Sequence, residues 1–165
     1  MTMPDRFRWK LLAAAALIAG TDQMIKHLIR KFEPGTLIWR RRPILELMRT
    51  DNQGAAFSVL SGKTVFLLAL TSLVLVCAAL AVLFYRGLSR ESRVCLAVML
   101  GGGLGNWIDR AVFRSVTDYI RLLFIRFPVF NFADICITCS VIYLIMLIVL
   151  DRFESHTGEK HGTGC

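Results

Sequence analysis

Charged residues are scarce in this sequence. Of its 165 residues 19% are charged and 55% are hydrophobic, and the mean hydropathy is +0.56. So few charges cannot cover an ordinary soluble globule, and so apolar a chain is neither disordered nor collagen-like. Acids are the scarcer kind, 12 against 20 Lys and Arg, which leaves a formal charge of +8. In an apolar chain this excess indicates anionic lipid headgroups rather than nucleic acid. We therefore expect a membrane protein with basic loops.

Cysteine and histidine form no recognisable metal or disulfide pattern. Four of the five cysteines lie within or beside apolar runs, which argues against a disulfide framework. Cys136-x-x-Cys139 has the spacing of a redox or zinc motif, but two packed small residues in an apolar helix explain it better. His156 and His161 lie in a polar tail, and the His-Glu-x-x-His motif does not occur. The sequence thus predicts no metal and no cofactor.

Four apolar runs approach the length that crosses a bilayer, about 20 helical residues. The run at 64–85 is uncharged, whereas the other three contain or border a carboxylate: Asp22, Asp109 or Asp134. We expect one membrane-embedded domain over 1–165, with transmembrane helices at about 11–29, 64–85, 94–110 and 133–150. A polar, disordered tail is expected at 151–165. The first run also has the layout of a secretory signal peptide, but no small-x-small cleavage site follows it.

The segment between the first two runs contains a small β element. Two short β-prone stretches, at 36–39 and 44–48, are separated by Arg40-Arg41-Arg42-Pro43. The expected fold is therefore an all-α polytopic membrane protein with a small extramembrane hairpin or sheet. Four spans put both termini and the 86–93 turn on one side, with eight Lys and Arg against eleven on the other. By the positive-inside rule this count slightly favours external termini.

Acidic and amide side chains gather at one membrane face. An ionisable residue in a membrane segment costs several kcal/mol unless it is paired or solvated, so each is a functional candidate. The predicted helices bring several charged residues to the face that also contains Asn52-Gln53-Gly54. These residues are Asp22 with Lys26, Asp109 with Arg110, Asp118 and Asp134. Asp22 with Lys26 can also be a simple i,i+4 pair, and Asp109 with Arg110 an ion pair that closes a helix end. The spacing of Ala97, Gly101 and Gly105 is typical of close helix packing.

Asp118 and Asp134 each lie among apolar neighbours. Two carboxylates close together in a low-dielectric site cannot both ionise easily, so one keeps a proton while the other acts as a base toward water. Such a pair can hydrolyse an amide without a metal. A proton relay or channel would use the same acids, and a serine–lysine peptidase would use Ser58 or Ser61 with Lys26. Two carboxylates could also hydrolyse a glycoside, but no set of sugar-binding aromatic residues accompanies them here.

Five motifs in order carry a resemblance to a known family. They are Asp22-Gln23-x-x-Lys26, Asn52-x-Gly54-Ala55-Ala56-Phe57, Gly101-Gly102-x-x-Gly105-Asn106-x-x-Asp109-Arg110, Val116-x-Asp118-Tyr119 and Phe130-Asn131-x-Ala133-Asp134. Together, over about residues 11–150, they resemble the lipoprotein (type II) signal peptidases of bacteria. Tyr119 is the one departure, because Phe is common there in the family.

The resemblance implies an intramembrane aspartyl endopeptidase that cuts diacylglyceryl-modified prolipoproteins before the lipidated cysteine. Asp118 and Asp134 would be the catalytic pair. The residues implied to support the pair or hold the substrate are Asn52, Gly54, Asn106, Asp109, Arg110, Asn131 and Ala133, with Asp22, Lys26 and Phe57 as structural support. The family also implies a monomer in the bacterial cytoplasmic (inner) membrane, in contact with phospholipids. Its termini would be cytoplasmic and its active site near the outer face, against the charge count.

Overall fold

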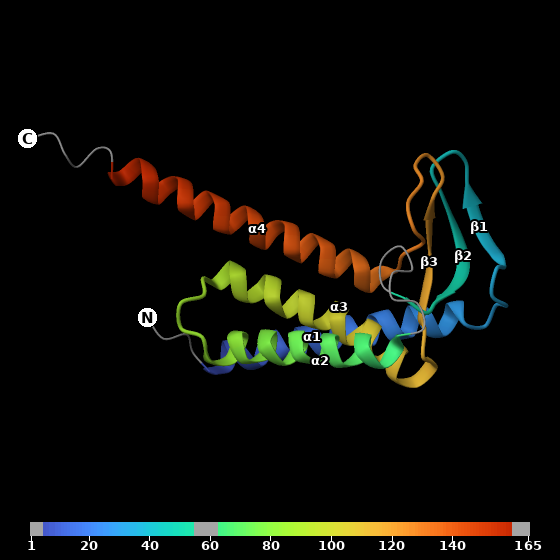
Figure 1. The fold of residues 1–165 in the computed structure, drawn as a ribbon, viewed down its shortest axis with the longest axis horizontal. Helices are drawn as coiled ribbons and strands as arrows, with labels where there is room; N and C mark the ends of the chain where they lie inside the picture. The colour runs from blue at the N-terminus through green and yellow to red at the C-terminus, as the bar shows by residue number, and fades with distance from the viewer. Residues whose placement is uncertain (1–4, 55–62, 160–165) are drawn as a thin grey trace, which may run out of the picture.

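The computed structural model describes the backbone of residues 5–54 and 63–159 and the side chains of 6–54 and 63–150. The described chain is mostly helical, with a small sheet at one end of the helices (Figure 1). Its elements in order are α1 (Asp5–Ile29), β1 (Leu37–Arg41), β2 (Leu45–Asn52), α2 (Thr64–Phe84), α3 (Arg90–Phe113), β3 (Val116–Leu122) and α4 (Phe132–Glu159).

Each helix covers one of the four apolar runs. Two of them, α2 and the 132–150 part of α4, are long and apolar enough to cross a membrane. The other two carry charges inside their apolar runs, Asp22 and Lys26 in α1 and Asp109 and Arg110 in α3. Both also extend beyond the predicted runs, to Asp5 and Arg90, into polar residues that the hydropathy pattern assigns to loops. Ser89 caps α3 by accepting a hydrogen bond from the Ser92 backbone N–H, which fixes the start of that helix.

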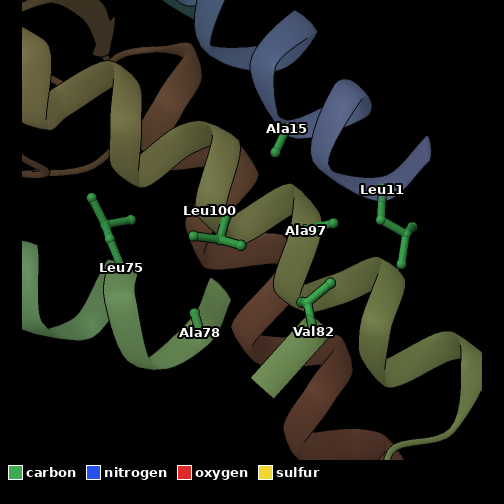
Figure 2. Packing of buried hydrophobic residues seen from close by; sticks show 7 residues of the cluster. All are labelled: Leu11, Ala15, Leu75, Ala78, Val82, Ala97 and Leu100. Atoms are coloured by element: carbon green, nitrogen blue, oxygen red, sulfur yellow. The ribbon is translucent and has the colours of Figure 1, made fainter. Parts of the chain in front are cut away.

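Helix α3 lies between the other helices and contacts all three. Its small residues permit close approach: a Cβ on Gly101 would lie 2.7 Å from the Ala15 carbonyl oxygen of α1, and one on Gly102 would lie 2.6 Å from the Ala133 carbonyl oxygen of α4. The small-residue face predicted at Ala97, Gly101 and Gly105 is therefore confirmed as a packing surface. The apolar core fills the space between α1, α2 and α3 (Figure 2) and comprises Leu11, Ala15, Leu75, Ala78, Val82, Ala97 and Leu100.

The three strands form one antiparallel sheet in the order β1-β2-β3. The predicted hairpin is confirmed, with strands longer than expected. The third strand was not predicted; it follows α3 after Arg114, which adopts a left-handed backbone conformation (φ 62°). The strands run across the direction of the helices, at the end where α1 and α3 finish and α4 begins (Figure 1). The sheet thus covers the face where the acidic residues gather.

The expected disordered tail is wrong for residues 151–159, because α4 continues through Glu159. Asp151, Arg152, Phe153 and Glu154 contain no helix breaker, and the first glycine of this stretch is Gly158. A change from apolar to polar residues ends a membrane run but does not by itself end a helix.

Candidate active site

Asp118 projects from β3 into the junction between the sheet and the helices. The residue is buried, with 3% of its surface exposed. Its Oδ1 accepts a hydrogen bond from Asn131 Nδ2 at 2.6 Å, and its Oδ2 accepts one from Asn52 Nδ2 at 3.0 Å. Asn52 ends β2, the strand paired with β3, so the sheet itself brings this amide to the carboxylate.

Asp134 lies in the first turn of α4, where it closes a reciprocal cap with Asn131. The Asp134 N–H donates to Asn131 Oδ1, and the Asn131 N–H donates to Asp134 Oδ2, both at 3.0 Å. This is a capping box with Asn at the N-cap and Asp three residues on. The other carboxylate oxygen, Oδ1, accepts from Asn106 Nδ2 at 2.8 Å. N-terminal capping thus orients the carboxylate as well as starting the helix.

Asn131 connects the two carboxylates. It is fully buried, and its single amide group donates both to Asp118 and to Asn106 Oδ1, the latter at 3.1 Å. Asn106 Oδ1 also accepts from the Lys26 ammonium at 2.8 Å. An ammonium group can only donate, so the amide oxygen of Asn106 must face Lys26. The NH₂ group of Asn106 then faces Asp134.

Two further carboxylates, Asp22 and Asp109, are paired with cations instead. Both are fully buried. Asp22 lies 2.7 Å from the Lys26 ammonium and accepts from the Ala133 N–H, while Asp109 pairs with Lys26 at 3.4 Å and with the Arg30 guanidinium. The Thr117 N–H donates to Asp109 at 2.9 Å, next to Asp118. Buried, charge-compensated carboxylates of this kind hold the elements together.

The electrostatic setting of Asp118 favours its protonated form. Burial, followed by the nearby charge of Asp134, raises the pKa of Asp118 from 3.8 to about 7, although the amides of Asn52 and Asn131 oppose the shift. Tyr119, the next residue on β3, accepts from the Phe132 N–H at the start of α4. Burial raises the pKa of the Tyr119 phenol to about 12. Tyr119 therefore stays neutral and acts as a spacer between strand and helix.

Asp118 and Asp134 both line a cavity of about 360 Å³. Arg110 lies on its wall and donates to the Gly54 carbonyl oxygen at 3.1 Å, while Gly54 N–H donates to Asn52 Oδ1. The remaining wall is mostly apolar and includes Val116, Phe127, Pro128, Val129, Phe130, Ile135, Thr138 and Cys139.

The structure gathers nearly all of the predicted site residues at this junction. Phe57 lies outside the described residues, as do Ser58 and Ser61. The interpretation of Asp109 and Arg110 as an ion pair with each other is wrong, because Asp109 pairs with α1 and Arg110 reaches Gly54. The Asp22–Lys26 i,i+4 pair is present, and both side chains are fully buried.

Two positioning residues, Arg30 and Thr117, were not predicted from the sequence, and Gln23 was named in a motif but given no role. Gln23 donates to Asp109 at 2.9 Å, and Arg30 donates to Thr117 Oγ1 at 3.0 Å. A signal for Arg30 was present, since residues 22, 26 and 30 recur every four positions and so lie on one helix face. No comparable pattern marks Thr117, whose role depends on its backbone N–H.

In the described residues no group of three or more His, Cys, Asp or Glu side chains is arranged to hold a metal ion. Cys136 and Cys139 are free thiols on α4; Cys136 is half-buried, whereas Cys139 is exposed, so the prediction that both are packed is wrong for Cys139.

The fold is that of a bacterial membrane enzyme. One solved structure described in those words superimposes with a TM-score of 0.79 at 28% identity and covers 94% of each chain. A second gives 0.75 at 29% identity, covering 86% of this chain and 92% of the other.

Sequence comparison then gives the family. The family model described as signal peptidase (SPase) II matches residues 14–150. A lipoprotein signal peptidase of Brevibacillus brevis is 35% identical over 144 residues, 87% of this chain and 96% of that protein. Another, of Bacillus subtilis, is 34% identical over 140 residues, 83% of this chain and 91% of that protein. The chain belongs to the signal peptidase II family, and this membership makes it a protease.

Proposed function

We propose that this chain is an intramembrane aspartyl endopeptidase that removes signal peptides from diacylglyceryl-modified prolipoproteins, with Asp118 and Asp134 as the catalytic pair. One contrast supports this assignment best. Asp22 and Asp109 are bound to cations, whereas every hydrogen bond that the described residues donate to Asp118 and Asp134 comes from an amide. Only carboxylates free of bound cations can readily pass a proton back and forth.

The chemistry divides between the two acids. Asp134, held by its capping box and by Asn106, accepts a proton from a water molecule whose oxygen attacks the scissile carbonyl carbon. Asp118, whose pKa of about 7 leaves about half of it protonated at neutral pH, donates its proton in this form to the carbonyl oxygen. As the tetrahedral intermediate breaks down, Asp134 passes its proton to the leaving amine nitrogen, the C–N bond breaks, and the re-forming carbonyl returns its proton to Asp118. Asn52 and Asn131 keep the Asp118 oxygens in place throughout.

Two apolar helices long enough to cross a membrane support a proposal for the membrane placement. We propose that all four helices cross the bacterial inner membrane as one domain and that both termini are cytoplasmic. The sheet and the catalytic pair then lie at the outer face. A lipid-anchored substrate reaches this position by lateral diffusion, so a single copy of the chain suffices as the enzyme. Water reaches the carboxylates because they lie at the end of the helices instead of at mid-membrane.

The substrate class follows from the relatives, which are named for lipoprotein processing. The apolar wall that includes Val129, Phe130 and Ile135 suits the small and apolar residues before a lipidated cysteine. Arg110, which also lines the cavity and donates to the Gly54 carbonyl oxygen, suits recognition of an extended peptide backbone. Cleavage on the N-terminal side of the cysteine leaves the lipid anchor on the product.

The test is a gel-shift assay on a lipidated precursor with Asp118→Asn and Asp134→Asn made singly. Each variant should insert and fold while losing at least about a thousandfold in rate, since each removes one proton-transfer partner. Glu91→Gln, an exposed carboxylate at the other end of α3, is the matched control and should cleave normally. Undiminished cleavage in either Asn variant would contradict the proposed pair and would favour a proton-path role for these acids.

A serine–lysine peptidase would lose cleavage in Ser58→Ala or Ser61→Ala. If the two aspartates catalyse the reaction, both variants should cleave normally. Lys26 is fully buried and bound to Asp22 and Asn106, which suits a structural cation.

A further inference from the structure

The sheet carries an arginine-rich tip that the proposed catalytic chemistry does not use. We define the sheet tip as residues 40–46, around the β1–β2 turn, together with residues 121–126 at and after the end of β3. It contains five arginines: Arg40, Arg41, Arg42, Arg121 and Arg126. Like charges do not gather without an organising group or a counter-charge.

Glu46 is the organising group. The residue lies on β2 with 1% of its surface exposed. Its Oε2 accepts from Arg40, with Nη2 at 2.6 Å and Nε at 2.7 Å, and its Oε1 accepts from Arg121 Nη1 at 3.1 Å. One buried carboxylate thus holds two guanidinium groups from different strands in fixed positions.

A hollow of about 380 Å³ lies among these groups and is lined by Arg40, Arg42, Pro43, Glu46, Arg121 and Leu123. Three guanidinium groups face one carboxylate, so the lining has a net charge of +2. Arg42 is the one of the three without an ion-pair partner in the described part of the chain. Fixed, incompletely neutralised guanidinium groups are suited to a phosphate, which they can bind through paired N–H donors.

Apolar side chains flank the hollow on the same two segments. Ile44 is 45% exposed and Phe124 is 63% exposed. The tip projects past the start of α4, away from α1 and α2 (Figure 1). If the helices cross the bilayer as proposed, the tip overlies the lipid beside α4, where Ile142 and Ile145 are exposed along the helix. Basic groups with adjoining apolar side chains are typical of a surface that rests on lipid headgroups.

From this juxtaposition we infer that the hollow at the sheet tip binds the phosphate of an anionic phospholipid. Arg42 supplies the free guanidinium, Arg40 and Arg121 are held ready by Glu46, and Ile44 and Phe124 contact the upper part of the acyl chains. The inference rests on the proposed membrane placement of the helices. It does not depend on which carboxylates catalyse cleavage.

The test compares two adjacent arginines that differ in one respect. Both side chains are exposed, but Arg42 lines the hollow and Arg41 does not. Purified chain in neutral detergent is titrated with phosphatidylglycerol, and with phosphatidylcholine in parallel, and bound lipid is measured by native mass spectrometry. Arg42→Gln should weaken phosphatidylglycerol binding about fivefold, the effect of one basic residue at an anionic surface, while Arg41→Gln should change it little. Neither substitution leaves Glu46 unpaired, so both variants should fold.

Three outcomes would overturn the inference: equal losses in Arg41→Gln and Arg42→Gln, equal affinity for the two lipids, or complete displacement of lipid by inorganic phosphate. The first would indicate diffuse attraction and the last a simple anion site. Asp118→Asn should bind phosphatidylglycerol as the unaltered chain does. A failure of the catalytic proposal therefore shows in the cleavage assay, and a failure of the lipid site shows in binding.

Discussion

Asn131 and Asp134 bind each other twice, through two hydrogen bonds of 3.0 Å in which each side chain accepts from the other's backbone N–H. The same Asn131 side chain donates to Asp118. Helix capping and orientation of the proposed catalytic pair thus depend on different atoms of one residue, Oδ1 for the cap and Nδ2 for the pair.

This division predicts that Asn131→Ser separates stability from activity. The serine hydroxyl can still accept from the Asp134 N–H, but it cannot also reach Asp118 and Asn106 as the amide does. Thermal unfolding of Asn131→Ser should lie close to that of the unaltered chain, with cleavage of a lipidated precursor reduced about a hundredfold or more. Asn131→Ala should lose the same activity and in addition about 1 kcal/mol of stability. Equal destabilisation of the two variants would show that the cap does not act through Oδ1.

The raised pKa of Asp118 makes stability depend on pH. Its pKa is 3.8 ordinarily and about 7 in the folded chain, so the folded state binds this proton more tightly. The resulting stabilisation is complete below about pH 3.8 and is lost as the pH rises through about 7. Asp118→Asn cannot ionise at this position. The melting temperature of Asp118→Asn minus that of the unaltered chain should therefore increase by at least about 2 °C from pH 5 to pH 8.5. A difference that stays constant over this range would contradict the assignment.

Cleavage should follow the same ionisation. If Asp118 donates a proton to the scissile carbonyl, the rate should fall as the pH rises above about 7. The measurement is the initial rate of precursor cleavage across neutral and alkaline pH. A rate that increases through this range would assign the proton to another group.

Close packing of α1 against α3 predicts opposite results for two glycines. A Cβ on Gly105 would run into the Asp22 carboxylate, so Gly105→Ala should destabilise the chain by about 1–3 kcal/mol. Gly20 on α1 has nothing within 4 Å of its Cβ position, so Gly20→Ala should be neutral or slightly stabilising. The free energy of unfolding of each variant is measured in a mixed micelle. Similar changes in Gly105→Ala and Gly20→Ala would argue against this contact between α1 and α3.

Lys26 compensates two buried acids, Asp22 and Asp109. Lys26→Met should therefore cost about 3–5 kcal/mol, because it leaves a buried charge without its partner. Adding Asp22→Asn should recover part of this loss, since the amide oxygen can still accept from the Ala133 N–H. Additive losses in the double variant would show that Lys26 does not act through Asp22.

Much of the fold could be predicted because apolar runs and local spacing carry the relevant information. The helices over 64–85 and 133–150 follow from hydropathy, and the close α1–α3 contact follows from Ala97, Gly101 and Gly105. Strand β3 could not be predicted in this way, because its pairing partner β2 is remote in sequence and its seven residues are short for a periodicity signal. Helix ends were set too short wherever charged residues such as Asp5 and Arg90 continue the helix.

The candidate site could likewise be predicted only in part. Asp118 and Asp134 stand out in the sequence as acids among apolar residues, and the family motifs specify their neighbours. Which acids pair with cations could not be predicted, because the partners of Asp109 come from α1 while Arg110 beside it turns to Gly54. Contacts between distant elements decide whether a buried carboxylate serves structure or chemistry.

The two proposed catalytic carboxylates come from elements of different kinds, Asp118 from a strand and Asp134 from the start of a helix. Membrane insertion of the helices alone therefore does not assemble the pair; the sheet must also form and dock against α3 and α4. Cleavage by the proposed pair therefore requires the docked sheet as well as the helices, so a chain whose sheet has not formed lacks one of its two carboxylates.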